Sequence, residues 1–396
     1  MTIKIPYARP WIEEDDIAAV IETLGSQFLS QGPNMAALEA ELCASFGVGH
    51  AVVCNSGTAA LHLAYMALEL GPERGLVTAA VTFLATANAA RMCGAPVAFA
   101  DVDPETGNLT ATAADAALDA ADVPVGAMTA VHLAGRPCDM PALRALAEAR
   151  GMALVEDACH APLARYRDYD GESHAVGACA HSDAAILSFH AIKHIATGEG
   201  GAVLTNNPEI ASRARRLRNH GMIREPAEWQ APPEPEAPWY YEMDELGWNY
   251  RASELQCALG RTQLAKLEAG IARRREIAGR YQEYLGNLPH LRCPPWPTSS
   301  DGHVWHLYPI AIDFEALGRT RGEMMRALAD AGIGTQVHYI PLYKQPYYAA
   351  NHSAPLAGAE QYYAQTLSIP MYAGLTDVDV DEVVAAIRAV LLGGGP

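Results

Sequence analysis

The chain has 396 residues, half of them hydrophobic, and a formal net charge of −18 at pH 7. A chain of this length is too long to fold around a single hydrophobic core, which predicts two or three domains. The negative charge argues against a nucleic-acid partner, which needs a basic face, but permits a small phosphorylated ligand in a local pocket. No apolar run could cross a bilayer and the N-terminus has no signal-peptide pattern, so we expect a cytoplasmic protein without a membrane partner.

The spacing of the cysteines and histidines does not indicate a metal site. The eight cysteines form no CxxC pair, and most lie in apolar stretches, which predicts buried free thiols in a reducing compartment. His160, His190, His194 and His338 could each be ligands or acid–base groups, but no pair has the spacing of a motif such as HExxH. We therefore expect no metal.

Strands and helices alternate from about Ile12 to Tyr250. The expected strands are 51–54, 75–78, 96–100, 126–131, 153–156, 184–189 and 201–205, and the expected helices include 59–70, 86–92 and 140–150. Short apolar strands that alternate with helices predict a mainly parallel sheet covered on both faces. We therefore expect a large α/β domain over residues 12–250.

Residues 251–396 are expected to form a smaller α+β domain. A proline-rich acidic stretch from Pro232 to Pro238 precedes it and predicts a surface loop. The region contains one or two expected helices over 253–280, an expected strand over 305–310 and an expected helix over 321–331.

Lysine is rare in this chain. Only Lys4, Lys193, Lys266 and Lys344 occur, and Lys193 lies within the stretch SFHAIKHIATGEGG at 188–201. An amine can lose its proton and act as a nucleophile, whereas a guanidinium effectively cannot. This position therefore predicts a lysine that holds an aldehyde cofactor as a Schiff base.

Asp157 ends the apolar run Ala153–Glu156. Ligands bind at the C-terminal ends of parallel strands in open α/β sheets. A carboxylate there could pair with a protonated pyridine nitrogen and keep the ring cationic, which makes it a better electron sink. The alternative is a helix cap that follows a strand.

Three further signals are modest one by one. The turn Asn55–Ala60 opens a helix and suits a phosphate, although Ser-Gly-Thr is also a plain capping sequence. Phe83 could stack on a cofactor ring or be a core aromatic, and His160 lies three residues after Asp157. Together these signals supply a phosphate cradle, a stacking ring, a pyridinium partner and a Schiff-base lysine, which are the needs of pyridoxal 5′-phosphate (PLP).

Five motifs in order resemble the DegT/StrS family of PLP-dependent sugar aminotransferases, from Ile5 to about Tyr372. They lie at 28–33, 55–61, 156–161, 188–201 and 247–251. The stretches 131–140 and 239–243 are most similar to the branch of UDP-4-amino-4,6-dideoxy-N-acetyl-β-L-altrosamine transaminases of pseudaminic acid synthesis. The resemblance implies an aspartate-aminotransferase-like α/β fold (fold type I) and a homodimer with shared active sites.

The resemblance also implies roles for residues. Lys193 would hold the cofactor, Asp157 would pair with its pyridine nitrogen, and the N-terminal segment 1–11 would pack at the active site. The other implied cofactor contacts are His160 near the ring hydroxyl, Phe83 on the ring, and Gly57, Thr58, Ser188 and the partner subunit's Asn249 at the phosphate. The candidates for the sugar nucleotide are Tyr7, Arg224, His338 and Tyr339.

The implied reaction is transamination of a nucleotide-linked 4-keto-6-deoxy sugar with L-glutamate as amino donor. The implied substrate is UDP-2-acetamido-2,6-dideoxy-β-L-arabino-hex-4-ulose, an intermediate of bacterial surface-sugar synthesis. Many relatives have His where this chain has Tyr343, which leaves the sugar contact open. The alternatives are another nucleotide-linked or free keto-sugar or a cyclitol, a deoxysugar 3-dehydratase (whose relatives carry His in place of Lys193), and a non-catalytic regulator that binds PLP or a sugar nucleotide.

Overall fold

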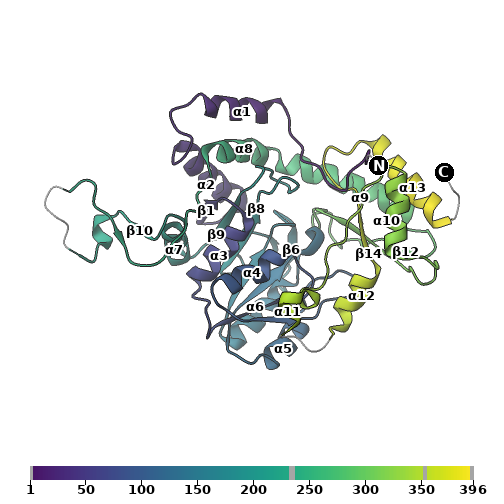
Figure 1. The fold of residues 1–396 in the computed structure, drawn as a ribbon, viewed down its shortest axis with the longest axis horizontal. Helices are drawn as coiled ribbons and strands as arrows, with labels where there is room; N and C mark the ends of the chain where they lie inside the picture. Colours follow the sequence, from purple (N-terminus) through teal and green to yellow (C-terminus); the bar gives the residue numbers. More distant parts are fainter. Residues whose placement is uncertain (1–2, 232–236, 351–354, 393–396) are drawn as a thin grey trace.

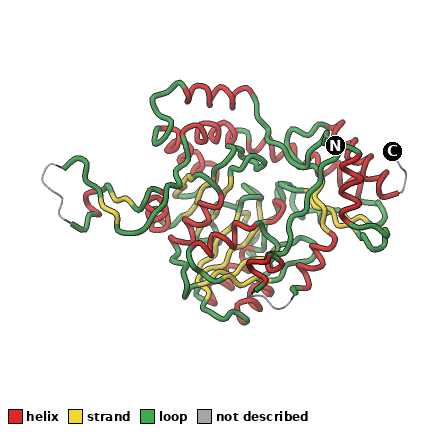
Figure 2. Tube along the Cα trace, viewed as in Figure 1, coloured by secondary structure: helices red, strands yellow, loops and turns green. Residues whose placement is uncertain are grey.

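A seven-stranded sheet forms the centre of the molecule (Figures 1 and 2). The computed structural model describes residues 3–231, 237–350 and 355–392. In spatial order the strands are β1 (His50–Cys54), β9 (Gly201–Thr205), β8 (Ala184–Ser188), β5 (Ala153–Asp157), β4 (Val125–Val131), β2 (Gly75–Ala79) and β3 (Val97–Ala100). Strand β9 runs antiparallel to β1 and β8, and every other neighbouring pair is parallel. The expected mainly parallel α/β sheet is therefore confirmed.

Alternate residues of each strand enter two different cores, because successive side chains of a strand point to opposite faces. Val155 and Ile186 pack with α3 (Gly57–Ala67) and α7 (Pro208–Arg218) on one face. Leu154 and Leu187 belong to the other core, with α2 (Pro33–Phe46), α6 (Met140–Arg150) and α8 (Glu254–Ala265). Helices α4 (Leu84–Met92) and α5 (Ala111–Asp119) complete the cover. Burial on both faces explains why these strands read as continuous apolar runs.

A buried carboxylate joins α8 to the start of α2. Glu254 accepts hydrogen bonds from the backbone N–H groups of Gly32 at 3.0 Å, Asn34 at 2.7 Å and Met35 at 3.3 Å. These donors would otherwise be unsatisfied at a helix N-terminus.

The short helix α1 (Glu14–Leu24) also packs on α8. The expected helical region at 253–280 is thus two helices, α8 and α9 (Leu267–Leu285).

A second core lies in the C-terminal part. It contains the antiparallel strands β12 (Leu291–Arg292), β13 (Tyr308–Ile312) and β14 (Thr366–Ile369), with α9, α10 (Arg321–Asp330) and α13 (Asp377–Leu392) around them. The short helices α11 (Pro346–Ala349) and α12 (Ala357–Gln365) lie between α10 and β14 in the sequence. The side chains of α9 belong to this second core from Ile277 onward, whereas α8 packs against α1 and α2. The domain division at residue 250 stays a prediction.

The expected strand at 305–310 is displaced. Strand β13 begins at Tyr308, because Trp305 has a φ of 51°. This left-handed conformation does not continue a strand. Trp305 nevertheless remains buried, with its ring stacked on that of His303 at 3.7 Å between centroids.

An arm extends from the left of the molecule in Figure 1 and carries the hairpin β10 (Met222–Ile223) and β11 (Glu242–Met243). Most of the proline-rich loop predicted at Pro232–Pro238 lies outside the described residues. Within the part of the chain that the structure covers, no helix is both long and apolar enough to cross a membrane.

Candidate active site

Asp157 ends β5 and is 6% exposed. Its Oδ2 accepts a hydrogen bond from the Thr86 hydroxyl at 2.9 Å, and its Oδ1 accepts one from the Cys159 N–H at 3.2 Å. The second bond is the turn contact that the capping interpretation expects, so both interpretations of Asp157 have a physical basis here. A buried carboxylate with two neutral donors is stabilised further by a cationic ligand.

Lys193 lies in the loop that connects β8 and β9. The loop closes on itself, since the N–H of Phe189 donates to the carbonyl of Gly200 at 2.8 Å and that of Ala191 to Gly198 at 3.0 Å. Burial lowers the pKa of Lys193, while the nearby Cys159 and Asp157 act in the opposite direction. A lowered pKa brings the amine closer to its nucleophilic, unprotonated form.

The other three lysines are committed to ion pairs. Lys4 pairs with Glu382 at 2.6 Å, Lys266 with Asp16 at 2.5 Å and Lys344 with Glu360 at 2.5 Å. Among the described residues, Lys193 has no such partner within 4.0 Å. Of the four lysines, three therefore serve as cations in ion pairs, and Lys193 is the one whose amine is left for another role.

The turn before α3 lies directly against the end of β8. Ser56 caps the helix, since its Oγ accepts the N–H of Ala59 at 3.0 Å. A Cβ on Gly57 would lie 2.8 Å from the Cβ of Ser188, so only glycine allows this approach. Gly57, Thr58 and Ser188 are all half-buried. A helix N-terminus beside a hydroxyl forms an anion-binding cradle.

His160 lies in a cluster of buried imidazoles. Its Nε2 is 3.3 Å from the hydroxyl of Tyr339, and its ring centroid is 4.3 Å from that of His306. Within the described residues, Nδ1 of His160 and Nδ1 of His306 are buried without a hydrogen-bond partner. Burial holds the pKa of both imidazoles well below the usual range, so both are neutral at pH 7.

Phe83 is not a core residue. Its side chain is 55% exposed, and its ring centroid lies 6.0 Å from that of Tyr339. Tyr339 in turn packs edge-on against His338, which lies 5.6 Å from Tyr7. The structure therefore brings Phe83, His160, Tyr339, His338 and Tyr7 into one aromatic chain, and it places the N-terminal segment in that chain.

Two predicted residues lie outside the aromatic chain. Arg224 is exposed and directly follows β10. The carbonyl of Asn249 accepts a hydrogen bond from Asn55 Nδ2 at 3.4 Å within the same chain, which places Asn249 beside its own phosphate turn. The role of Asn249 in a partner's site stays a prediction.

Sequence reasoning missed Thr86 and His306. Thr82 and Thr86 lie on either side of Phe83, four positions apart, and their hydroxyls are 3.0 Å from each other. This spacing was the available signal for a polar face on α4. His306 had no local signal, because its contact with His160 joins residues far apart in the chain.

Residues 10–388 match the DegT/DnrJ/EryC1/StrS aminotransferase family. The chain belongs to this family. It is a PLP-dependent sugar aminotransferase, which acts on a sugar substrate and an amino donor.

Three relatives are informative. The spore coat polysaccharide biosynthesis protein SpsC of Bacillus subtilis is 39% identical, over 98% of this chain and 97% of its own. PseC of Helicobacter pylori, an aminotransferase involved in the biosynthesis of pseudoaminic acid, is 30% identical with a TM-score of 0.88, over 98% of this chain and 99% of its own. The aminotransferase TlmJ of Streptoalloteichus hindustanus is 32% identical with a TM-score of 0.87, over 98% and 99%.

The buried histidines predict a loss of stability in acid. Burial lowers the pKa of His338 to about 3, and it lowers those of His160 and His306 as well. Unfolded histidine has a pKa of about 6.5. Between these values the unfolded chain binds more protons than the folded one, so stability is complete above about pH 6.5 and falls as the pH decreases, by up to about 1.4 kcal/mol per pH unit for each histidine.

The urea midpoint should therefore fall steadily from pH 7 to pH 5. His306→Asn should make this fall shallower, whereas His290→Asn, at an exposed histidine, should not change it. An equal pH dependence in wild type and His306→Asn would show that His306 does not contribute as described.

Proposed function

We propose that the chain transfers the amino group of L-glutamate to C4 of a nucleotide-linked 4-keto-6-deoxy sugar, with Lys193 and Asp157 as its catalytic residues. The observation that carries the proposal is the buried Asp157 carboxylate beside Lys193, the one lysine without an ion pair to any residue that the structure describes. The proposed substrate is UDP-2-acetamido-2,6-dideoxy-β-L-arabino-hex-4-ulose. The likeness to PseC supports it, and the higher identity to SpsC supports a role in a surface polysaccharide.

The residues fit PLP at each of its polar groups. Gly57, Thr58 and Ser188 would hold the phosphate, because the cradle has a helix N-terminus and has no space for a Cβ at Gly57. Asp157 would face the pyridine nitrogen. The unpartnered Nδ1 of His160 would serve the ring hydroxyl. Phe83, exposed and next to α4, would cover the ring.

When bound, PLP supplies an aldehyde that accepts an amino group and a ring that withdraws electrons. Asp157 would hold the proton on the pyridine nitrogen and so maintain the positive charge that makes the ring effective. Thr86 fixes the Asp157 carboxylate through the 2.9 Å hydrogen bond. Lys193 would hold the aldehyde group. Its amine would also take the proton from the donor α-carbon and would deliver a proton to the sugar carbon when the keto-sugar is the acceptor.

The aromatic chain at the N-terminal segment is the proposed sugar site. The rings of Tyr7, His338 and Tyr339 contact one another in sequence, and the Tyr339 hydroxyl lies next to His160. Aromatic rings suit the apolar face of a 6-deoxy sugar and the base of its nucleotide. Arg224, which is exposed and directly follows β10, is the proposed contact for the diphosphate of a neighbouring subunit's substrate.

A homodimer in the cytoplasm is part of the proposal. Helix α1 exposes Ile17, Ile21 and Leu24, which are 53%, 62% and 57% exposed. Their spacing of four and three residues puts them on one face of the helix. An apolar stripe of this kind marks a protein–protein contact. The partner subunit would add Asn249 to the shared site.

The substrate proposal is tested with UDP-, GDP- and dTDP-linked 4-keto-6-deoxy sugars. L-Glutamate should bleach the visible colour of the PLP-loaded protein, and mass spectrometry should then detect an amino sugar from the UDP-linked substrate. Lys193→Ala and Lys193→Arg should each lower turnover at least about 10²-fold, because arginine keeps the charge but not the reactive amine.

Turnover with only a GDP- or dTDP-linked sugar would exclude the proposed substrate. Normal turnover by Lys193→Ala would exclude the proposed catalytic residue. Colour that persists in excess L-glutamate would exclude glutamate as donor.

The dimer is tested by light scattering. The wild type should have the mass of two chains, and Ile21→Glu should shift it toward one chain on dilution, because the substitution would bury a charge in the contact. Val378→Glu, which changes a valine that is 66% exposed on α13, is the matched control and should leave the mass unchanged. A monomeric wild type would rule out the proposed shared site.

A further inference from the structure

Two histidines and an aspartate meet outside the proposed active site. Asp168 follows β6 (Arg165–Arg167), His174 is the centre of β7 (Ser173–Ala175), and His181 lies in the loop before β8. One potential ligand atom from each residue lies within 4.8 Å of the other two. Across residues 3–231, 237–350 and 355–392 this is the only group of three or more such side chains.

The spacing is close to that of a metal centre. Asp168 Oδ2 accepts a hydrogen bond from His174 Nε2 at 2.7 Å. The rings of His174 and His181 are 5.0 Å apart and nearly perpendicular, at 82°. Zinc binds imidazole nitrogen and carboxylate oxygen at about 2.0–2.2 Å, so ligand atoms around one tetrahedral ion are about 3.4 Å apart. Small rotations of the side chains bring the three atoms to that separation.

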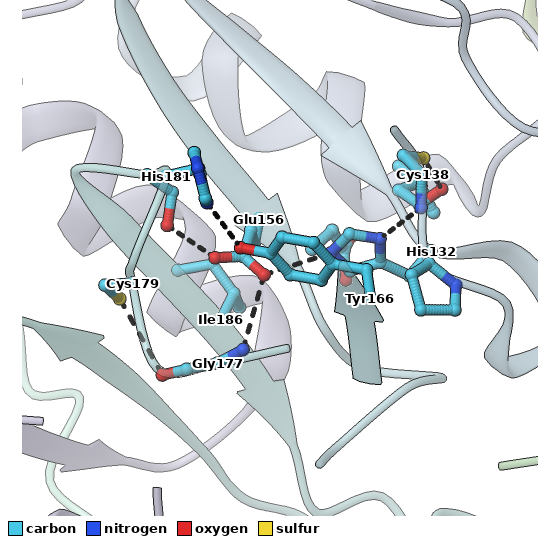
Figure 3. A network of polar contacts seen from close by, with 12 residues as sticks. His132, Cys138, Glu156, Tyr166, Gly177, Cys179, His181 and Ile186 are labelled. Carbon is cyan, nitrogen blue, oxygen red and sulfur yellow. Dashed lines mark hydrogen bonds and ion pairs between the residues drawn. The ribbon is translucent and has the colours of Figure 1, made fainter. Parts of the chain in front are cut away.

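The atoms of these side chains that face away from the cluster are held by other groups. Asp168 Oδ1 accepts the backbone N–H of Asp170 at 3.0 Å and of Glu172 at 2.8 Å, which leaves Oδ2 for the cluster. The hydroxyl of Tyr166 lies 3.0 Å from His181 Nδ1 (Figure 3), which leaves Nε2 available. Metal-binding histidines and carboxylates are typically oriented in this way by outer hydrogen bonds.

An ion pair alone explains only part of the cluster. The hydrogen bond from His174 lowers the pKa of Asp168, as a simple imidazolium–carboxylate pair would. That pair does not involve His181, whose ring centroid lies 5.0 Å from that of His174 and whose Nδ1 is 3.0 Å from the hydroxyl of Tyr166. A second imidazole at this distance from an imidazole–carboxylate pair is the arrangement of a metal site with two histidines and one carboxylate.

We propose that Asp168, His174 and His181 bind one divalent transition-metal ion of the zinc class, with solvent in the fourth position. Two imidazoles and one carboxylate form a donor set that suits zinc and related ions. No metal was expected from the sequence, because neither the cysteines nor the histidines considered there have metal-ligand spacing. Asp168, His174 and His181 are six and seven positions apart and match no helical motif. The ion would join the β6–β7 hairpin to the loop before β8.

The site is separate from transamination, and it does not rest on the proposed function. Its connection to the active site is structural. Ser182, next to His181, donates to Glu156 Oε1 at 2.5 Å, and Glu156 precedes Asp157 in β5. The expected consequence of metal binding is therefore stability of this region.

The test is calorimetric titration of tag-free, chelator-treated, PLP-loaded protein with zinc chloride. One ion should bind per chain, and zinc should raise the unfolding temperature. Asp168→Asn and His181→Ala should each weaken zinc binding at least about 10-fold and remove the thermal shift, and Tyr166→Phe should weaken binding about 10-fold through the loss of an outer hydrogen bond. Circular dichroism verifies that each variant is folded.

His290→Ala, at an exposed histidine outside the cluster, is the control and should bind zinc as the wild type does. Stoichiometric binding that is equal in the wild type, Asp168→Asn and His181→Ala would overturn the proposal, because the ion would then lie elsewhere. Absence of binding by folded wild type would overturn it as well and would leave a hydrogen-bonded ion pair only. Cobalt(II), added in place of zinc, should reproduce the same order of affinities.

Discussion

A carboxylate buried at the end of a parallel strand is the constraint around which this molecule is built. Asp157 has one neutral hydroxyl and one backbone N–H as partners, and burial of a carboxylate is costly unless positive charge is near. In the proposed site, the Lys193 amine and a cationic cofactor ring would provide that charge. Two opposing effects act on the pKa of Lys193. Burial favours the neutral amine and lowers the pKa, whereas Asp157 favours the ammonium form. The burial of Asp157 and the proposed catalysis therefore both involve the pair Asp157 and Lys193.

The opposite face of β5 is fixed by a polar network that requires no ligand. Glu156 accepts hydrogen bonds from Ser182 Oγ at 2.5 Å and Gly177 N–H at 3.3 Å, and it pairs with His132 Nε2 at 3.2 Å (Figure 3). The N–H of Cys138 donates to His132 Nδ1 at 3.0 Å, so the proton of this imidazole lies on Nε2 and points to Glu156. Neighbouring residues of a strand face opposite sides, and this satisfied network therefore positions Asp157 from behind.

The strands of the sheet could be predicted from the sequence because each is a short apolar run, and the predicted helices at 59–70, 86–92 and 140–150 correspond to α3, α4 and α6. Lys193, Asp157 and the Gly57 turn could also be singled out, since each residue type is unusual in its local setting. The contact between Gly57 and Ser188 could not, because it joins segments that are adjacent only in the folded sheet. Nor could the pairing of His160 with His306, or the meeting of Asp168, His174 and His181, for the same reason. The exposure of the Phe83 side chain could not be predicted either, because it depends on which distant segments pack over it. The local sequence favoured a core position.

The central claim is that Lys193 is the residue that holds the cofactor, and its most direct test is reduction of the PLP-loaded protein with sodium borohydride followed by peptide mass spectrometry. Reduction makes the lysine–cofactor linkage permanent. With only four lysines in the chain, the position can be assigned without ambiguity. The account predicts a phosphopyridoxyl group on the peptide that contains Lys193 and none on those with Lys4, Lys266 or Lys344. A modified Lys266 or Lys344, or a coloured protein with no modified Lys193, would contradict it.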